Sequence, residues 1–372
     1  MNQRLHTPTR RSAWLLGLLV ALTLVAAACS SDKKTSTSSG SSSSSSSSPA
    51  YDYTSLTGTL NGSGSSFQDA FDQKVITAFK AVASGVSVTY TKSGSGAGKT
   101  DLQNQVVQFA GTDSLIKAAD LPKYKGGAVL YFPTVGAPIT VSYNLSGVSK
   151  LQLSGDVLAG IFGGTITNWN DPKIAADNAG VSLPSKTIVV VHRSDASGTT
   201  SNFTKFLTKA SPTVWTLGSG DTVSWPSSTQ GAEKNSGVAS VISSTDGAVG
   251  YVDLADAASA KLSTALIKNS SGAFVEAKLP GAAAALSGST VASDLTYDPV
   301  NASGADAYPI TSPTWIIVYA KQPSAAAAAA LKGFLNYILT DGQGLANSVG
   351  YAPLPSDTAQ KALAQLSQIT GP

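Results

Sequence analysis

The chain has 372 residues, enough for two or three domains, and only 13% of them are charged, about half the usual share. Three arginines in residues 1–28 account for the formal net charge of +3, so the remainder carries 22 basic and 22 acidic residues. A neutral chain lacks the basic surface that nucleic-acid binding requires, which excludes that class of partner. A single cysteine, Cys29, excludes internal disulfides and cysteine-rich zinc sites, and a single histidine beyond residue 28, His192, excludes histidine-cluster metal sites.

Residues 1–28 have the pattern of a secretory signal. Arginines precede an apolar run at residues 14–25, which is shorter than the roughly 20 residues that a membrane-spanning helix needs. Three alanines stand directly before Cys29, and this junction resembles a bacterial lipobox, which implies that Cys29 is acylated and becomes the new N-terminus. A twin-arginine signal is the alternative suggested by residues 9–11, but we expect general secretion because Ala13 stands where that signal has phenylalanine.

The segment after the signal is a tether. Residues 30–48 are a serine-rich tract of low complexity that cannot bury apolar surface. We therefore predict a lipidated cysteine and flexible linker over residues 29–53, which would hold a globular body at the extracytoplasmic face of the cell membrane.

From about Leu56 onward, short apolar runs alternate with amphipathic stretches. The apolar runs predict strands at residues 86–90, 128–132, 139–143, 187–191, 248–252 and 315–319. Helical spacing predicts helices at residues 67–82, 197–207 and 325–339. Strands that alternate with helices indicate an α/β fold.

Three loops rich in glycine and hydroxyl side chains, at residues 61–67, 93–98 and 193–200, each lie between a predicted strand and a predicted helix. At such a junction, unpaired backbone N–H groups and the positive end of the helix dipole favour an anion. One such loop is usually an ordinary turn, but three in one chain predict a shared anion site.

Two enzymatic interpretations compete with anion binding. The second loop continues into Lys99 and Thr100, but Ser93 stands where a nucleotide-binding P-loop needs its first glycine. A serine hydrolase would need His192, which directly precedes Arg193 at a strand end, and no G-x-S-x-G motif is present. A catalytic triad is recognised by geometry, so the sequence leaves this alternative open. We expect a protein that is not an enzyme, with no catalytic residues, no metal and no cofactor, in which Trp169 and Trp225 serve packing.

At these loops the chain resembles the substrate-binding subunit of the high-affinity ABC phosphate importer, over nearly all of residues 56–370. Gly62–Phe67 is similar to the first glycine loop of that family, and Gly94–Ser95 to its second. Residues 108–113 are similar to the segment that ends in a ligand-binding aspartate. Residues 193–199 match the R-x-D-x-S-G-T signature, which is the most specific of these motifs.

The resemblance implies a two-lobed periplasmic-binding-protein-like fold of type II, with a ligand cleft between the lobes and two hinge crossovers. We place the crossovers near Thr134 and Pro309. Lobe one would then combine residues 54–134 with 310–372, and lobe two would be residues 135–309.

The resemblance also implies the site residues: hydroxyls of Ser66, Ser95, Ser197 and Thr199, backbone N–H groups of Phe67, Gly198 and Thr199, the guanidinium of Arg193, and the carboxylate of Asp113. Asp195 would orient Arg193. A carboxylate beside a dianion is repulsive unless the ligand brings a proton, so Asp113 favours a protonated oxyanion. Without the resemblance, Asp113 would be interpreted as a helix cap before Ser114.

The function implied is that of an extracytoplasmic receptor for inorganic phosphate, which delivers its ligand to the transmembrane permease subunits of an ABC importer. We expect a monomer held at the membrane by the lipid on Cys29. Three alternatives remain: a receptor for sulfate or another tetrahedral oxyanion, an exported phosphoesterase or serine hydrolase, and an adhesive or structural lipoprotein.

Overall fold

The computed structural model describes residues 51–372, so the predicted signal, Cys29 and nearly all of the tether lie outside the described residues. The strands are β1 (Gly58–Gly64), β2 (Val86–Lys92), β3 (Phe109–Thr112), β4 (Val129–Tyr143), β5 (Gln152–Leu153), β6 (Val189–Arg193), β7 (Gln230–Ala232), β8 (Ala248–Asp253), β9 (Ser263–Thr264), β10 (Leu266–Lys268), β11 (Phe274–Val275), β12 (Thr311–Tyr319) and β13 (Ala352–Pro353). The α-helices are α1 (Asp69–Val82), α2 (Ser95–Gln103), α3 (Gly155–Phe162), α4 (Pro172–Asp177), α5 (Gly198–Ala210), α6 (Lys234–Ser244), α7 (Leu254–Ser259), α8 (Leu279–Ser287), α9 (Ala325–Leu339) and α10 (Ser356–Gln365). Three 3-10 helices cover η1 (Ala118–Lys123), η2 (Asp341–Val349) and η3 (Leu366–Gln368).

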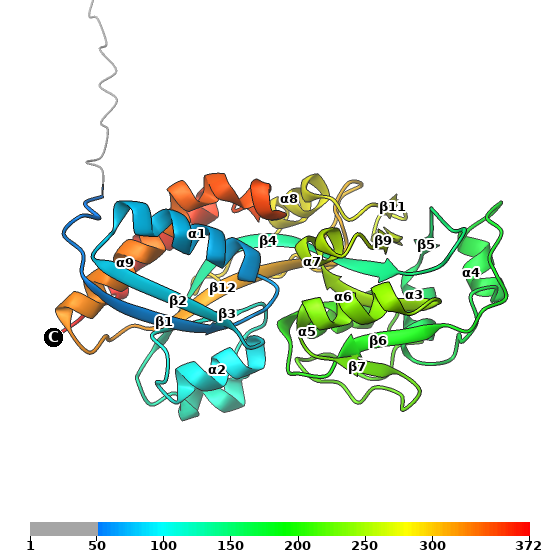
Figure 1. The fold of residues 1–372 in the computed structure, drawn as a ribbon, viewed down its shortest axis with the longest axis horizontal. Helices are drawn as coiled ribbons and strands as arrows, with labels where there is room; N and C mark the ends of the chain where they lie inside the picture. The colour runs from blue at the N-terminus through cyan, green and yellow to red at the C-terminus, as the bar shows by residue number, and fades with distance from the viewer. Residues whose placement is uncertain (1–50) are drawn as a thin grey trace, which may run out of the picture. The chain divides into compact units, whose positions relative to one another are not determined.

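A mixed sheet runs through the molecule in the order β2-β1-β3-β12-β4-β8-β6-β7 (Figure 1). Strands β1, β2 and β3 are parallel to one another, and so are β6, β7 and β8, whereas β12 and β4 are antiparallel to their neighbours. Helices α1 and α9 pack on the first group, and α5 and α6 pack on the second. This arrangement confirms the predicted α/β fold class.

The long strand β4 joins these two groups. Its first part, through Pro138, pairs with β12, and its second part, from Ile139, pairs with β8. The prediction of two strands at residues 128–132 and 139–143 is therefore wrong, because pairing with β12 keeps the chain extended through the intervening residues. The Ile139 N–H donates to the Ile310 carbonyl at 2.7 Å, so the two segments that pass between the groups lie side by side. The lobe boundaries given above stay a prediction.

The remaining predicted elements are found close to their expected places. Helix α9 matches residues 325–339, and β2, β6, β8 and β12 lie within a few residues of the predicted strands. The first helix begins at Asp69, so Phe67 is buried in the turn that precedes it. Val82 is 39% exposed at the end of α1 and is not part of the core face that the spacing predicted.

Aromatic residues fill the core on each side of the sheet's midpoint. The ring of Phe334 on α9 lies 5.3 Å from Phe79 on α1 and 5.5 Å from Phe109 on β3. On the other side, Phe203 of α5 stacks on Tyr251 of β8 at 4.4 Å. Burial of each such side chain contributes roughly 1.5–3 kcal/mol, and this packing fixes where the strand ends lie.

Candidate functional site

The predicted site residues lie at the carboxyl ends of parallel strands. Ser65 to Phe67 follow β1, Ser95 follows β2, Asp113 follows β3 and Asp195 follows β6. In an open α/β sheet the crevice outside these strand ends is the usual ligand position. Residues from three separate predicted loops are thereby brought together in one region, as the sequence indicated.

Asp113 is the centre of a buried hydroxyl cluster. The Ser65 hydroxyl donates to Asp113 Oδ1 at 2.6 Å, and the Ser95 hydroxyl donates to Oδ2 at 3.3 Å. The alternative interpretation of Asp113 as a helix cap is wrong, because no helix begins at Ser114 and the next, η1, starts at Ala118. Ser65 is not among the site residues predicted from sequence, whereas the neighbouring Ser66 is.

Burial raises the pKa of Asp113 from its ordinary range to about 7, although the hydrogen bond from Ser65 and the charge of Arg193 oppose the shift. Asp113 is only 1% exposed. A carboxyl group with this pKa exchanges its proton near neutral pH, so it can accept a proton from a ligand oxygen or donate one to it.

Arg193 and Asp195 form a bidentate ion pair. Arg193 Nε donates to Asp195 Oδ1 at 2.7 Å, and Nη2 donates to Oδ2. The guanidinium is buried, and the backbone N–H of Lys234 also donates to Asp195 Oδ1 at 3.0 Å. This geometry fixes the plane of the guanidinium and leaves Nη1 available to another acceptor; the role of Asp195 in orienting Arg193 toward a ligand stays a prediction.

The start of α5 carries the other predicted donors. The Ser197 side chain caps this helix by accepting from the Thr200 N–H at 3.2 Å, and Ser197, Gly198 and Thr199 are all buried. A Cβ placed on Gly198 would lie 2.7 Å from Asp113 Cβ and 2.7 Å from Ser95 Oγ. Only glycine allows the positive end of this helix to approach so closely to the hydroxyl cluster.

Replacing Gly198 with alanine should therefore abolish tight anion binding. The new methyl group would overlap Asp113 and Ser95, so α5 could not reach the position that completes the site. Calorimetric titration with inorganic phosphate should give a loss of at least about a hundredfold in affinity. Gly220→Ala is the matched control, since a Cβ there meets no atom closer than 3.5 Å. Wild-type affinity in Gly198→Ala would contradict the close packing.

Asn235, on α6, is a site residue that the sequence analysis missed. Its side-chain Nδ2 donates to Ser66 Oγ at 3.3 Å and to Thr199 Oγ1 at 3.2 Å, so it links two predicted hydroxyl donors. Asn235 is fully buried, and its Oδ1 has no hydrogen-bond partner among the described residues. It could not be found from sequence because Lys234-Asn235 belongs to no glycine loop and carries no motif.

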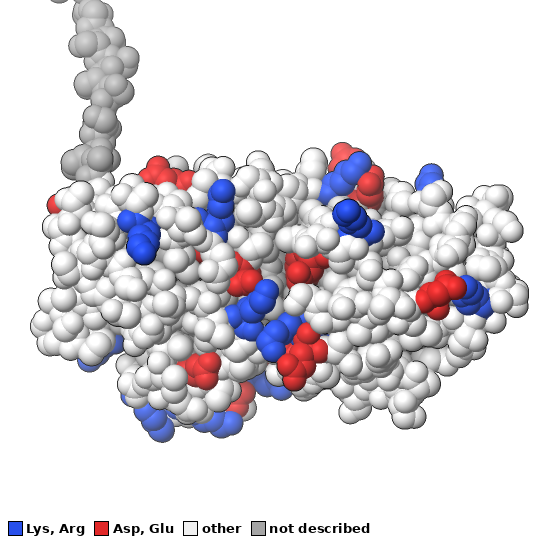
Figure 2. Space-filling view, in the orientation of Figure 1, with Lys and Arg blue, Asp and Glu red and all other residues white. Residues whose placement is uncertain are grey.

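Charged side chains of both signs gather in the middle of one face (Figure 2), where α1 and β2 lie beside α6 and α7 (Figure 1). Lys92 on β2 pairs with Asp69 on α1 at 3.1 Å. Burial raises the pKa of Asp72 and of Asp253 well above the ordinary range, which reduces the negative charge that they carry. Buried directional donors, and not a surplus of positive charge, therefore make this region suitable for an anion.

The geometry does not support the serine hydrolase alternative. His192 Nδ1 lies 2.9 Å from the Arg193 carbonyl, and its ring stacks on Trp225 at 4.9 Å. Within residues 51–372 the hydrogen bond recorded for this ring is to that backbone group and not to a serine or threonine hydroxyl. A nucleophile activated by His192 is thus absent from the described residues. Trp169 is buried and bonds the Gly247 carbonyl at 2.9 Å, which is the packing role predicted for it.

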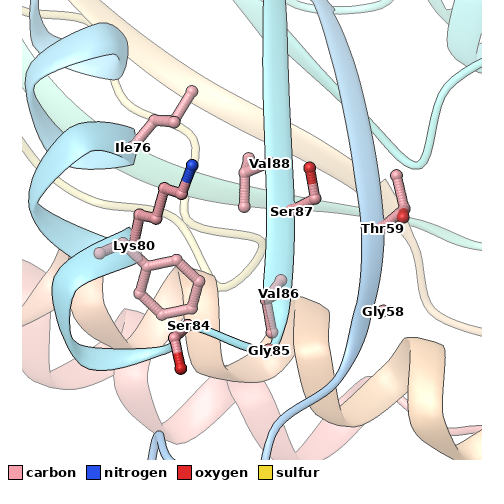
Figure 3. A pocket seen from close by; sticks show the side chains of 10 residues that line it. Gly58, Thr59, Ile76, Lys80, Ser84, Gly85, Val86, Ser87 and Val88 are labelled. Atoms are coloured by element: carbon pink, nitrogen blue, oxygen red, sulfur yellow. The ribbon is translucent and has the colours of Figure 1, made fainter.

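Away from the strand-end site, a cavity of about 530 Å³ lies between α1 and the edge formed by β1 and β2 (Figure 3). Lys80 and Ile76 of α1 face Val86 and Val88 of β2 across it. Lys80 is the one charged side chain among its lining residues, and it stands in the last turn of α1, where the helix dipole is negative. No arginine and no helix N-terminus line this cavity, whereas both are found at the strand-end site.

Comparison with known proteins places the chain in a family. A PBP superfamily domain matches residues 39–342. The chain is 35% identical over 307 residues to the phosphate-binding protein PstS 3 of Mycobacterium leprae (strain TN), covering 80% of this chain and 83% of that protein. It is 34% identical over 318 residues to the phosphate-binding protein PstS of Pasteurella multocida (strain Pm70), covering 84% and 91%. The chain belongs to the PstS family of phosphate-binding proteins.

A solved phosphate-binding protein has the same fold as this chain. A high affinity periplasmic phosphate-binding protein, solved with phosphate at pH 8.5, superposes with a TM-score of 0.70 at 25% identity, covering 83% of this chain and 94% of that one. The predicted periplasmic-binding-protein-like fold is thereby confirmed, and so is the prediction of a binding protein and not an enzyme. Among residues 51–372, no helix combines the length and the hydropathy needed to cross a membrane.

Proposed function

We propose that this chain is an extracytoplasmic receptor that binds inorganic phosphate at the strand-end site and delivers it to the permease of an ABC importer. The observation that carries the proposal is the buried Asp113 carboxyl group, set among hydroxyl donors and facing the start of α5. The hydroxyl and N–H donors can bond the oxygens of an oxyanion, and the Asp113 carboxylate can accept a hydrogen bond from an oxyanion that still holds a proton. The names of the PstS relatives support the same ligand.

The proposed ligand contacts divide by chemistry. Arg193 supplies the charge-assisted bonds, and the N–H groups of Phe67, Gly198 and Thr199 supply neutral ones. The Phe67 N–H donates to Ser65 Oγ at 3.0 Å in the structure and would exchange that bond for the anion. The hydroxyls of Ser66, Ser95, Ser197 and Thr199 bond protein groups in the structure, and each can rotate to donate to an anion oxygen. We add Asn235 as the residue that orients Ser66 and Thr199.

The position of the anion and the closing motion of the protein follow from the proposed division at the crossovers. We place the anion between residues 54–134 with 310–372 on one side and residues 135–309 on the other, so that the two sides close over it. Hydrogen bonds already join these sides, including Asn202 Nδ2 to the Asp113 carbonyl at 2.6 Å. Release to a permease requires that these bonds break.

Calorimetric titration of the purified protein with phosphate and then with sulfate tests the ligand. At pH 8, where about a tenth of Asp113 is protonated, we expect tight binding of phosphate and binding of sulfate that is weaker by at least about tenfold. Equal affinity for the two anions would favour a general oxyanion receptor. Turnover of a chromogenic phosphate ester would favour the hydrolase alternative.

Location depends on Cys29, the only cysteine of the chain. Two or more acyl chains hold a protein stably in a bilayer, whereas one does so only marginally. Cys29→Ser should move the protein from the membrane fraction to the periplasm or the medium, as judged by cell fractionation and immunoblotting. A variant that remains in the membrane fraction at full leader length would refute the lipid anchor. Ser30→Ala, next to it, should behave as wild type.

A further inference from the structure

A partly buried ion pair joins two parts of the chain beside the proposed anion site. Lys99 Nζ on α2 lies 2.6 Å from Asp221 Oδ2, and their side chains are only 12% and 17% exposed. Lys99 also donates to Ser114 Oγ at 2.8 Å and to the Leu115 carbonyl at 3.3 Å. Each of the three N–H groups of the ammonium therefore has an acceptor. This is the lysine that gave the second glycine loop its likeness to a P-loop.

The pair connects α2 to the loop that contacts the start of α5, and the first residues of these two helices face each other across the site. Lys99 stands one turn after Ser95, whose hydroxyl contacts Asp113. On the other side, the Asp221 carbonyl accepts from the N–H of Ser197, the residue that caps α5, at 2.9 Å. A second link runs parallel to it, since the Gly96 N–H donates to the Ala196 carbonyl at 3.0 Å.

We propose that the Lys99–Asp221 pair is a latch that holds the starts of α2 and α5 together and slows the release of the bound anion. The proposal rests on the function proposed above. Lys99 belongs to residues 54–134 and Asp221 to residues 135–309, so opening between these parts separates the two charges. Separation of a largely buried pair, in which the ammonium has three acceptors, is costly, and the loss of one partner acts mainly on dissociation. Lys99 is thus a positioning residue and not a ligand of the anion.

The competing explanation is that Lys99 acts on the anion only through its charge. The two explanations differ in how the anion affinity should change when each partner of the pair is removed. If charge alone mattered, removal of Lys99 would weaken anion binding and removal of Asp221 would strengthen it. If the pair is a latch, removal of either partner weakens binding, because the same contact is lost.

The test measures dissociation of inorganic phosphate from Lys99→Met and Asp221→Asn. Radiolabelled phosphate is chased with excess unlabelled phosphate to give koff, and calorimetry gives Kd, from which kon follows. We expect both variants to raise koff at least about tenfold, with kon changed by less than about threefold. The double variant should resemble either single one, and the charge-swapped Lys99→Asp/Asp221→Lys should recover part of the slow release. Lys123→Met is the control, since the Lys123–Asp120 pair at 2.7 Å lies within one part of the chain and is exposed.

Opposite effects of the two single variants, or koff values equal to wild type, would overturn the latch. Thermal unfolding of each variant separates loss of the latch from loss of the fold. Small-angle scattering supplies a readout that needs no ligand: without phosphate, the radius of gyration of Lys99→Met should exceed that of wild type. If the wild-type protein bound no phosphate, the proposed function would fail, while the scattering comparison would still decide whether the pair holds the chain closed.

Discussion

Asp113→Asn is expected to lose most of the discrimination between phosphate and sulfate, chiefly by binding sulfate better. Phosphate keeps a proton near neutral pH and can donate it to the buried carboxylate, whereas sulfate would place an anionic oxygen against it. Two unit charges about 4 Å apart repel by roughly 4 kcal/mol at an effective dielectric constant near 20. That energy corresponds to at most about a thousandfold preference, reached only at a pH high enough to keep the Asp113 carboxylate ionised beside sulfate, and the amide removes it by offering an N–H₂ donor. Calorimetric titration of both anions measures the change.

The pH dependence of sulfate binding gives a second measurement of the same role. Because burial raises the pKa of Asp113 to about 7, the protonated carboxyl group predominates below that pH and can donate to a sulfate oxygen. If only this form binds sulfate, the affinity should rise about tenfold between pH 8 and pH 6, as the protonated fraction rises through its midpoint. Asp113→Asn should show no such rise. Sulfate binding as tight as phosphate binding in the wild-type protein at pH 8 would refute the role of Asp113, and the phosphate assignment with it.

Arg193→Ala is expected to reduce phosphate affinity by at least about a hundredfold. Hydrogen bonds to a charged group contribute roughly 1.5–3 kcal/mol each, about twice the neutral value, and the substitution removes the whole guanidinium. It also leaves Asp195 without its bidentate partner close to the anion. Arg193→Lys should lose less, because the charge stays while the planar fork is lost. Ser95→Ala should lose least, since it removes one neutral donor.

The control for Arg193 is Lys209→Ala, on the last turn of α5. Lys209 pairs with Asp298 at 3.0 Å and is 40% exposed, so its removal changes the net charge by the same amount without touching the site. We expect wild-type affinity in this variant. Unchanged phosphate affinity in Arg193→Ala would mean that the third glycine loop has only a structural role.

The sequence identified the three strand-to-helix loops because their glycines and hydroxyl side chains are local features with a local physical cause. Helix α2 starts at Ser95 and helix α5 directly after Ser197, and neighbouring residues in the chain set both starts. Asn235 and Ser65 were not predicted from the sequence because the features that mark them are not local. Asn235 contacts Ser66, which lies 169 positions earlier in the chain, and Ser65 contacts Asp113, which lies 48 positions later. Neither residue stands out within its own segment.

The sequence by itself determined the fold class, the composition of the loops and the motif around Arg193, because apolar periodicity and turn chemistry depend only on residues that are close together in the chain. Only the tertiary structure decided that β4 is one strand that joins two groups of the sheet, and that Lys99 pairs with Asp221, 122 positions further along the chain. The pKa of Asp113 is also a tertiary property. It depends on burial and on the approach of α5, which long-range packing alone provides.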